Sequence, residues 1–414
     1  MTVPHDWAIY GPFSSLNDKQ EVAISQDGQK EAMEHAGRTG GLPFVGVGWY
    51  RTEFDVPQFQ AGKRATILFD GAMSHANVYI NGQKVGYWPY GYNSFHFDIT
   101  KYLKPGEKNT LAVRLENLPE SSRWYPGAGL YRNVHLIITE DAYIPVWGTY
   151  ITTPSVNEKF AKVNVRTKVV LPEGADPAKY SVETSVWNPN KQKLTAVRTS
   201  LAQMKYNNNQ AEQEFVIQAP SLWSPEMPAL YSAETRLYEG DKLKDIYTTP
   251  FGIRSIEIIP DKGFFLNGKR TVFKGVCNHH DLGPLGAAVN DAAIRRQIRI
   301  LKDMGCNAIR TSHNMPAPEL IRACDEMGMM IMAESFDEWN VAKCKNGYNL
   351  LFDEWAEKDL VNLLHNFRNN PSVVMWCIGN EVPNQWNEGD CKIAKWLQDI
   401  CHREDPTRPV TQGM

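Results

Sequence analysis

The chain has 414 residues, more than one hydrophobic core usually holds, so we expect roughly two to four domains. Apolar residues make up 42% and charged residues 22% of it, the values of an ordinary globular protein. The net charge of −3 excludes an electrostatic case for a nucleic-acid or membrane-surface partner, and no run of roughly 18 apolar residues predicts a transmembrane helix.

Residues 1–143 have the pattern of an all-β domain. Short runs with alternating polarity are separated by Gly, Pro and Asn, and they lie at 64–70, 76–88 and 109–117. Within the second run, Asn81-Gly82 is a strong signal for a two-residue hairpin turn. Several strands at this spacing predict a jelly roll or another β-sandwich.

Residues 144–255 form a second β-region. The expected strands lie at 162–171, 181–188, 213–219 and 229–240, with Asn- and Lys-rich turns between them. Because this stretch contains no cysteine, it predicts an immunoglobulin-like β-sandwich that lacks the disulfide between its sheets.

From residue 256 to residue 414, apolar strands alternate with amphipathic helices. The strand runs are 271–277, 307–312, 329–335, 373–379 and 409–412. Three helical faces lie between them: Ile294, Ile298 and Leu301; Trp355, Leu360, Leu363, Leu364 and Phe367; and Ile393, Trp396, Leu397 and Ile400. This alternation is typical of a TIM barrel or a doubly wound sheet. No Gly-rich fingerprint follows a strand, which disfavours the dinucleotide-binding fold.

The cysteines give no sign of cross-links or of a zinc site. Their number is odd, all lie in the last third of the chain, and none forms a CxxC pair. We expect buried free thiols.

Polar residues collect at the ends of the predicted parallel strands. They are Asn278-His279-His280-Asp281, His313-Asn314, Glu334 with Asp337-Glu338-Trp339, and Asn380-Glu381. In a TIM barrel these positions share the C-terminal face, where active sites form. A strand that is apolar and then ends in Glu381 predicts a carboxyl group in a cleft with apolar walls, where burial raises its pKa and suits it to act as a general acid.

Each residue has a structural interpretation beside the functional one. A single Glu can cap a helix, a single His can be a structural group, and Asp337 and Glu338 can be solvated loop charges. Repetition over four consecutive strands favours a hydrolase that uses carboxylates.

Two stretches resemble the signatures of glycoside hydrolase family 2. Residues 307–313, which read NAIRTSH and are followed by Pro316, are similar to the signature N-x-x-R-x-S-H-Y-P. Residues 368–381, RNNPSVVMWCIGNE, are similar to the acid/base signature. The stretches PHDW (4–7), GWYR (48–51), WYPGAGLYRNV (124–134) and FGIR (251–254) resemble the N-terminal domains of this family, so that the likeness spans the chain.

The resemblance implies a jelly roll, an immunoglobulin-like sandwich and a TIM barrel, and a retaining β-glycosidase that needs no cofactor. Glu381 would be the acid/base and Asn380 would bind the sugar 2-hydroxyl. His279 and His313 would bind other hydroxyls, and Arg310 would steady the carboxylates. A jelly-roll loop would bring the substrate-binding pair Arg123 and Trp124 to the barrel mouth. Trp339 is expected to line the sugar pocket, with a place in the core as the alternative.

The sequence departs from the family pattern in three places. Asn314 and Met315 stand where the signature has a tyrosine, and Glu338-Trp339-Asn340 lacks the imidazole of a magnesium site known in some relatives, so we expect no metal. The family's nucleophile lies near the seventh barrel strand, and the chain stops at Met414 in the fifth. We therefore expect a fragment, shortened at its start as well, that is inactive alone. Its open barrel edge favours either self-association, which would give a homo-oligomer, or poor folding of that part.

The sugar stays open at this point. The stretch GVCNHHDLG (275–283) and the WYPGAG loop look most like the β-galactosidase branch, whereas β-glucuronidases and β-mannosidases share both signatures. A carbohydrate-binding fragment without catalysis is the other alternative. The sequence leaves the cellular compartment undecided between export and the cytoplasm.

Overall fold

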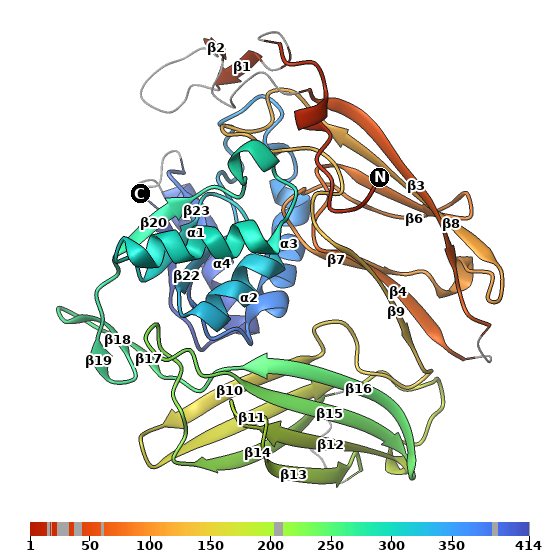
Figure 1. Cartoon of the computed structure of the whole chain (residues 1–414), viewed down its shortest axis with the longest axis vertical. Helices are drawn as coiled ribbons and strands as arrows, with labels where there is room; N and C mark the ends of the chain where they lie inside the picture. The colour runs from red at the N-terminus through yellow and green to blue at the C-terminus, as the bar shows by residue number, and fades with distance from the viewer. Residues whose placement is uncertain are drawn as a thin grey trace.

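The computed structural model describes residues 1–14, 17, 19–22, 33–36, 44–58, 62–202, 210–382 and 388–413. Two β-sandwiches, built from the first 251 residues, flank a parallel sheet that is covered by helices (Figure 1). No helix within these described ranges is long and apolar enough to cross a membrane.

The N-terminal β-sandwich consists of two antiparallel sheets, with strand orders β3-β8-β5-β6 and β7-β4-β9. Its strands are β3 (Gly46–Asp55), β4 (Arg64–Phe69), β5 (Ala76–Ile80), β6 (Gln83–Trp88), β7 (Phe95–Asp98), β8 (Lys108–Asn117) and β9 (Val134–Thr139). Every second residue of β4 and β5 is buried between the sheets, as the alternation predicts. The predicted hairpin is confirmed: β5 pairs with β6 through Asn81 and Gly82, whose φ angles are 51° and 81°. A separate pair, β1 (Lys19–Val22) and β2 (Met33–Ala36), lies beyond this sandwich.

The immunoglobulin-like β-sandwich likewise has two antiparallel sheets, β10-β11-β14 and β13-β12-β15-β16. Its strands are β10 (Thr149–Val156), β11 (Phe160–Lys168), β12 (Tyr180–Trp187), β13 (Lys193–Ser200), β14 (Gln210–Gln218), β15 (Tyr231–Glu239) and β16 (Lys242–Phe251). Burial alternates along β14 without a break, so one face fills the core and the other faces solvent.

A small antiparallel sheet, which the sequence did not predict, precedes the parallel strands. It consists of β17 (Ile256–Ile259), β18 (Gly263–Leu266) and β19 (Lys269–Arg270). Phe264 and Leu266 pack with Met330 and Val374 of the parallel sheet. The sequence predicted a parallel strand at 271–277, but this strand begins only at Gly275. Lys269–Arg270 form the last strand of the small sheet, and residues 271–274 connect it to the parallel sheet.

The C-terminal part is a five-stranded parallel sheet in the sequential order β20-β21-β22-β23-β24. The strands are β20 (Gly275–Asn278), β21 (Ala308–Thr311), β22 (Met330–Glu334), β23 (Val373–Asn380) and β24 (Val410–Gly413). The helices are α1 (Asp291–Asp303), α2 (Pro318–Met327), α3 (Phe352–Phe367) and α4 (Glu388–Glu404). In a sequential order each strand is added on the same side of the one before it. Because the crossovers between parallel strands are right-handed, all the helices then lie on one face of the sheet. The arrangement is therefore part of a (β/α)8 barrel and not a doubly wound sheet.

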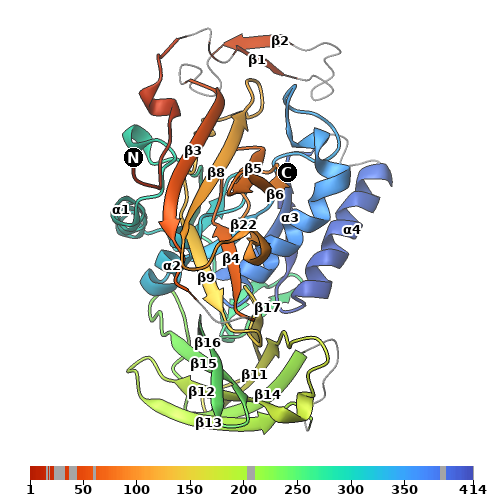
Figure 2. The same cartoon turned by 90° about the vertical axis from the view of Figure 1, so that its right-hand side faces the viewer.

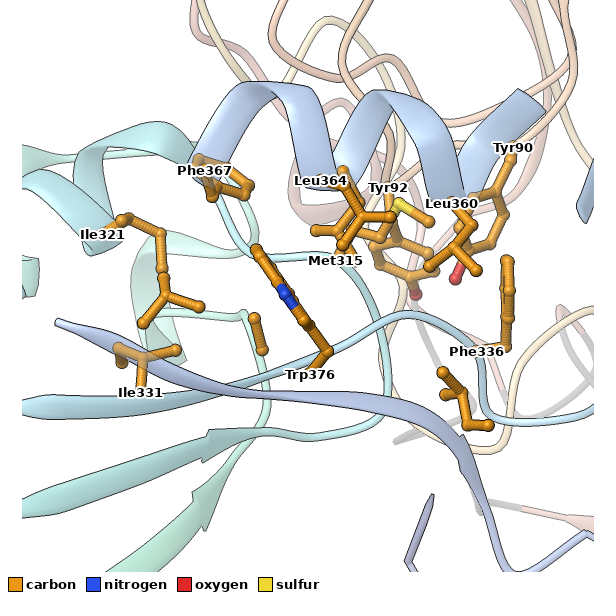
Figure 3. Close-up of a cluster of buried hydrophobic side chains, with 14 of the residues drawn as sticks. Tyr90, Tyr92, Met315, Ile321, Ile331, Phe336, Leu360, Leu364, Phe367 and Trp376 are labelled. Atoms are coloured by element: carbon orange, nitrogen blue, oxygen red, sulfur yellow. The ribbon is translucent and has the colours of Figure 1, made fainter. Parts of the chain in front are cut away.

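The predicted helical faces are buried with three exceptions, Trp355, Ile393 and Trp396, of which Ile393 is half-buried against the core. Figure 3 shows Leu364 and Phe367 of α3 pointing toward Trp376 of β23, as expected, while Leu360 points toward Phe336 in the same cluster. Trp355, on the same helix, instead contacts Trp88 of the N-terminal β-sandwich, with ring centroids 5.1 Å apart. On α4, which runs beside α3 in Figure 2, Trp396 remains 36% exposed. Helix α2 was not predicted, since it is only 10 residues long.

Buried polar contacts join the N-terminal β-sandwich to the partial barrel. The guanidinium group of Arg132, which is fully buried, donates to the backbone carbonyls of Met315 and Pro316. Trp88 and Asn93 donate to the carboxylate of Asp359 on α3. Because such groups are costly to bury without partners, these contacts fix where the sandwich loops meet the barrel.

The cysteines are free thiols, as predicted, but they are not all buried. Cys324, Cys344, Cys377 and Cys401 lie in the interior, Cys306 is half-buried, and Cys277 and Cys391 are exposed.

Candidate active site

The predicted strand-end residues share one edge of the parallel sheet. Asn278 of β20 lies beside Thr311 of β21, and Asn380 of β23 lies beside Gly413 of β24. The strands are parallel, so the residues that follow them emerge on the same side. This edge collects His279, His313, Glu334, Asn380 and Glu381.

A buried ion pair lies under this edge. Glu334, whose side chain is fully buried, is bound by Arg310 of β21, with 2.5 Å between Nε and Oε2. Arg310 Nη2 also donates to Glu334 Oε1 at 3.1 Å and to Asn380 Oδ1 at 2.8 Å. The Nδ1 atom of His313 lies 3.0 Å from Glu334 Oε1. Arg310 therefore links a buried carboxylate to the side-chain amide of Asn380.

Asp337 lies in the loop after β22 and binds the nitrogen atom of the Asn380 side-chain amide. Asn380 Nδ2 donates to Asp337 Oδ1 at 2.9 Å. Both oxygens of Asp337 accept hydrogen bonds from Arg123, and Lys343 lies 3.1 Å away. Burial by itself would raise the pKa of Asp337, but the bonds from Arg123 and the two nearby positive charges outweigh it and hold the pKa at about 2. Asp337 is thus a carboxylate at neutral pH, and Asn380 is oriented from both sides.

Three rings form a wall beside these groups. The ring centroids of Trp124 and His279 are 5.1 Å apart, those of Trp124 and His313 are 5.7 Å apart, and those of the two imidazoles are 5.6 Å apart. Trp124 is held by a hydrogen bond from its indole nitrogen to the hydroxyl of Tyr92. Burial lowers the pKa of His279, which favours the neutral imidazole that can both donate and accept hydrogen bonds.

Glu381 is more open than the sequence led us to expect. Its side chain is 53% exposed. The described residues therefore do not enclose Glu381 in an apolar cleft, contrary to the expectation from the sequence. Its Oε2 atom lies 3.9 Å from Nη2 of Arg123. The backbone has a φ angle of 40°, and its N–H donates to the carbonyl of Gly413 at 2.9 Å. The physical reason for the exposure is that the residue lies at the rim where β23 ends.

Trp339 does not line the open edge. It is 2% exposed and packs in the barrel core, where its indole nitrogen donates to the carbonyl of Ile378 at 2.8 Å. A side chain at Gly379 would place its Cβ 2.8 Å from the same indole nitrogen, which explains the glycine before Asn380. The expectation of substrate contact by Trp339 is therefore corrected in favour of the core.

Glu338 is also a structural residue. Its carboxylate accepts hydrogen bonds from the backbone N–H groups of Lys343 and Asn349, and it is 3% exposed. Burial raises its pKa to about 7. No group of three or more His, Cys, Asp or Glu side chains within the part of the chain that the structure describes is arranged to hold a metal ion.

The structure thus brings together Arg123, Trp124, His279, Arg310, His313, Asn380 and Glu381 from the predicted set. It adds Asp337, which the sequence placed at a strand end without assigning it a role, and Lys343, which the sequence did not single out. A strand-end position marks Asp337, whereas no pattern marks Lys343, because a lysine in a polar loop ordinarily faces solvent.

Three family models match the chain. They are described as the TIM barrel domain of glycosyl hydrolases family 2 at residues 257–413, as glycosyl hydrolases family 2 at 143–254, and as the sugar binding domain of that family at 42–140.

Curated relatives carry two different activities in their names. The β-galactosidase BoGH2A of Bacteroides ovatus is 44% identical over 445 residues, covering 100% of this chain and 50% of its own length. A β-glucuronidase of Bacteroides fragilis is 32% identical, covering 89% of this chain and 54% of its own length. The chain therefore spans about half the length of these relatives.

Solved structures agree with the fold. A glycosyl hydrolase family 2 member from Bacteroides cellulosilyticus superposes with a TM-score of 0.90 at 36% identity, over 100% of this chain and 52% of that one. A β-glycosidase from Bacteroides vulgatus has a TM-score of 0.87 at 35% identity, over 100% of this chain and 50% of that one.

Proposed function

The chain belongs to glycoside hydrolase family 2, and on that premise we propose that it forms the acid/base half of a retaining exo-β-glycosidase, a β-galactosidase. In the proposed reaction Glu381 protonates the glycosidic oxygen and a second carboxylate attacks the anomeric carbon. Glu381 then deprotonates the water that releases the sugar.

The observation that carries this proposal is the double anchoring of Asn380 beside Glu381. Arg310 binds its amide oxygen and Asp337 accepts from its amide nitrogen, so the side chain cannot turn freely. A fixed amide next to the acid is suited to bind the sugar 2-hydroxyl, an interaction that strengthens as the transition state forms.

The ring wall supports the binding of a neutral sugar. The neutral imidazole of His279 can donate to and accept from hydroxyl groups, the ring of His313 lies beside it, and the indole of Trp124 offers a flat apolar face for a pyranose. These roles, like those of Arg123 and Arg310, belong to the proposal.

The charge balance favours galactose over an acidic sugar. In the cluster Arg310 is paired with Glu334, while Arg123 and Lys343 share Asp337, and Arg123 also approaches Glu381. Recognition of a uronate carboxylate needs a cation that is not already neutralised. Among the described residues of this edge each cation already has an ion-pair partner, with Arg123 and Lys343 sharing Asp337, and this supports a β-galactoside over a β-glucuronide; a β-mannoside is the neutral alternative.

The proposed reaction also needs a second carboxylate as its nucleophile. Glu334 and Asp337 are committed to Arg310 and to Arg123 with Lys343, so neither is suited to attack a sugar. We propose that the nucleophile comes from sequence outside residues 1–414, and that the 414-residue chain alone binds carbohydrate without cleaving it.

An assay with three chromogenic substrates tests both parts. p-Nitrophenyl β-galactoside, β-glucuronide and β-mannoside are offered to this chain and to the product of the complete reading frame that contains it. We expect hydrolysis of the galactoside by the second protein only, with the β anomer as the first product in the NMR spectrum. Turnover by the 414-residue chain would contradict the assignment of the nucleophile, and preference for the glucuronide would contradict the assignment of the sugar.

A further inference from the structure

Lys343 is a buried lysine in the loop after β22, with a side chain that is 1% exposed. Its Nζ atom donates to the backbone carbonyl of Asp337 at 2.7 Å, to Asp337 Oδ1 at 3.1 Å and to the carbonyl of Asn380 at 2.5 Å. An ammonium group has three donors, so these oxygens use all of its hydrogen-bonding capacity.

Through these contacts Lys343 reaches the peptide group between Asn380 and Glu381. The carbonyl of this peptide accepts from Lys343, and its N–H donates to the carbonyl of Gly413. The φ angle of 40° at Glu381 lies in the left-handed region, which a residue with a side chain keeps only where its surroundings hold it. The plane of this peptide, and with it the direction of the Glu381 side chain, is therefore held from both sides.

A purely structural role accounts less well for a lysine at this place. The loop is already anchored by Glu338, which accepts the backbone N–H groups of Lys343 and Asn349. Burial of an ammonium group is unfavourable, and an apolar side chain of the same length would fill the space as well. Two of the three Nζ contacts of Lys343 are with Asp337 of the same loop, and the third crosses to the carbonyl of Asn380 at the end of β23, so the ammonium group joins the loop to the residue before Glu381.

We propose that Lys343 is a positioning residue for the acid/base step, in which its ammonium group fixes the Asn380–Glu381 peptide and the Asp337 carboxylate together. This inference rests on the proposed role of Glu381. Without the ammonium group the carbonyl of Asn380 loses its donor, and Glu381 is free to turn away from the glycosidic oxygen.

The test compares two leaving groups in the product of the complete reading frame. The value of kcat/KM for a phenyl β-galactoside needs the general acid, whereas that for a 2,4-dinitrophenyl β-galactoside does not, because its leaving group departs without a proton. For Lys343→Met we expect kcat/KM to fall by about 30-fold or more on the phenyl substrate and by less than about 3-fold on the dinitrophenyl substrate, since acid catalysis contributes about 10²–10⁴-fold and misplacement loses part of it.

The ratio of the two values does not depend on how much of the variant is folded, because the concentration of active protein cancels. Lys343→Gln, which keeps two N–H donors but loses the charge, should change the ratio of the two kcat/KM values in the same direction by a smaller factor. Lys345→Met is the matched control, since this lysine lies in the same loop with a side chain that is 57% exposed, and its ratio should match the wild type.

Equal losses on both substrates in both Lys343 variants would overturn the proposal and leave Lys343 a structural residue. A wild-type protein that hydrolyses neither substrate would instead count against the proposed function itself.

Discussion

Arg123 of the N-terminal β-sandwich makes a bidentate ion pair with Asp337 of the partial barrel, with N···O distances of 2.9 and 2.6 Å across 214 residues of sequence. The same guanidinium group lies 3.9 Å from the Glu381 carboxylate. One loop of a β-sandwich therefore takes part in the geometry of a site whose other residues follow barrel strands. The two parts of the chain need each other for this site to be complete.

Replacing Arg123 by lysine should weaken the site without unfolding the protein. Lysine keeps the charge but cannot bind both oxygens of Asp337, and a hydrogen bond to a charged group contributes about 1.5–3 kcal/mol. We expect kcat/KM on a β-galactoside to fall by about 10- to 100-fold with little change in melting temperature. Arg114→Lys is the control, because Arg114 pairs with Glu116 on the surface of the same sandwich. Wild-type kinetics in the Arg123 variant would show that the pair is dispensable.

Replacing Glu381 by glutamine tests the acid directly. Glutamine cannot donate a proton, so kcat/KM on phenyl β-galactoside should fall by about 10²–10⁴-fold, while the dinitrophenyl substrate should be affected far less. Glu354→Gln on helix α3, with a side chain that is 72% exposed, should behave as the wild type. Unchanged turnover of the phenyl substrate by the Glu381 variant would end the assignment of the acid/base.

Asp359 should make stability depend on pH. Burial raises its pKa to about 7, although hydrogen bonds from Tyr348, Asn93 and Trp88 oppose the shift. A raised folded-state pKa means that the folded protein binds the proton more tightly, so this contribution to stability is present below the unfolded pKa of about 4 and is lost as pH rises through about 7.

The variant Asp359→Asn cannot titrate and isolates this effect. The stability of the wild type relative to the variant should fall by on the order of 2–3 kcal/mol between pH 5 and pH 8. Urea unfolding followed by tryptophan fluorescence at the two pH values measures it. Burial also raises the pKa of Glu338 to about 7 and that of Asp325 to about 6. Both groups titrate in the wild type and in the variant, so their contributions cancel in the difference in stability between the two proteins. A difference that stays constant with pH would mean that Asp359 is ionised throughout.

The two tryptophans predicted for substrate binding should separate in their effects. Trp124→Ala should raise KM by about 3- to 10-fold, because an aromatic contact contributes about 0.5–1.5 kcal/mol beyond burial. Trp339→Ala should cost about 3–5 kcal/mol of stability, as for other tryptophans removed from a core. Kinetics and thermal melting of both variants measure the contrast. A rise in KM without loss of stability in the Trp339 variant would show that Trp339 binds the sugar and contradict its assignment to the core.

Much of the fold could be predicted because period and turn chemistry are local. Alternation along residues 64–70 and 76–88, the Asn81-Gly82 turn and the apolar run before Asn380 each predict an element from neighbouring residues alone. Helix α2 and the small sheet of β17, β18 and β19 were missed, because they are too short to show a period.

The strand-end positions of His279, His313, Asn380 and Glu381 were determined by the sequence itself, since parallel strands must place their ends on one edge. Only the tertiary structure decided that Asp337 joins Arg123 to Asn380, that Lys343 is buried against the carbonyl before Glu381, and that Trp339 faces the core. The reason is that a strand's period determines the direction of its residues, whereas a loop side chain takes its direction from partners that lie far away in the sequence.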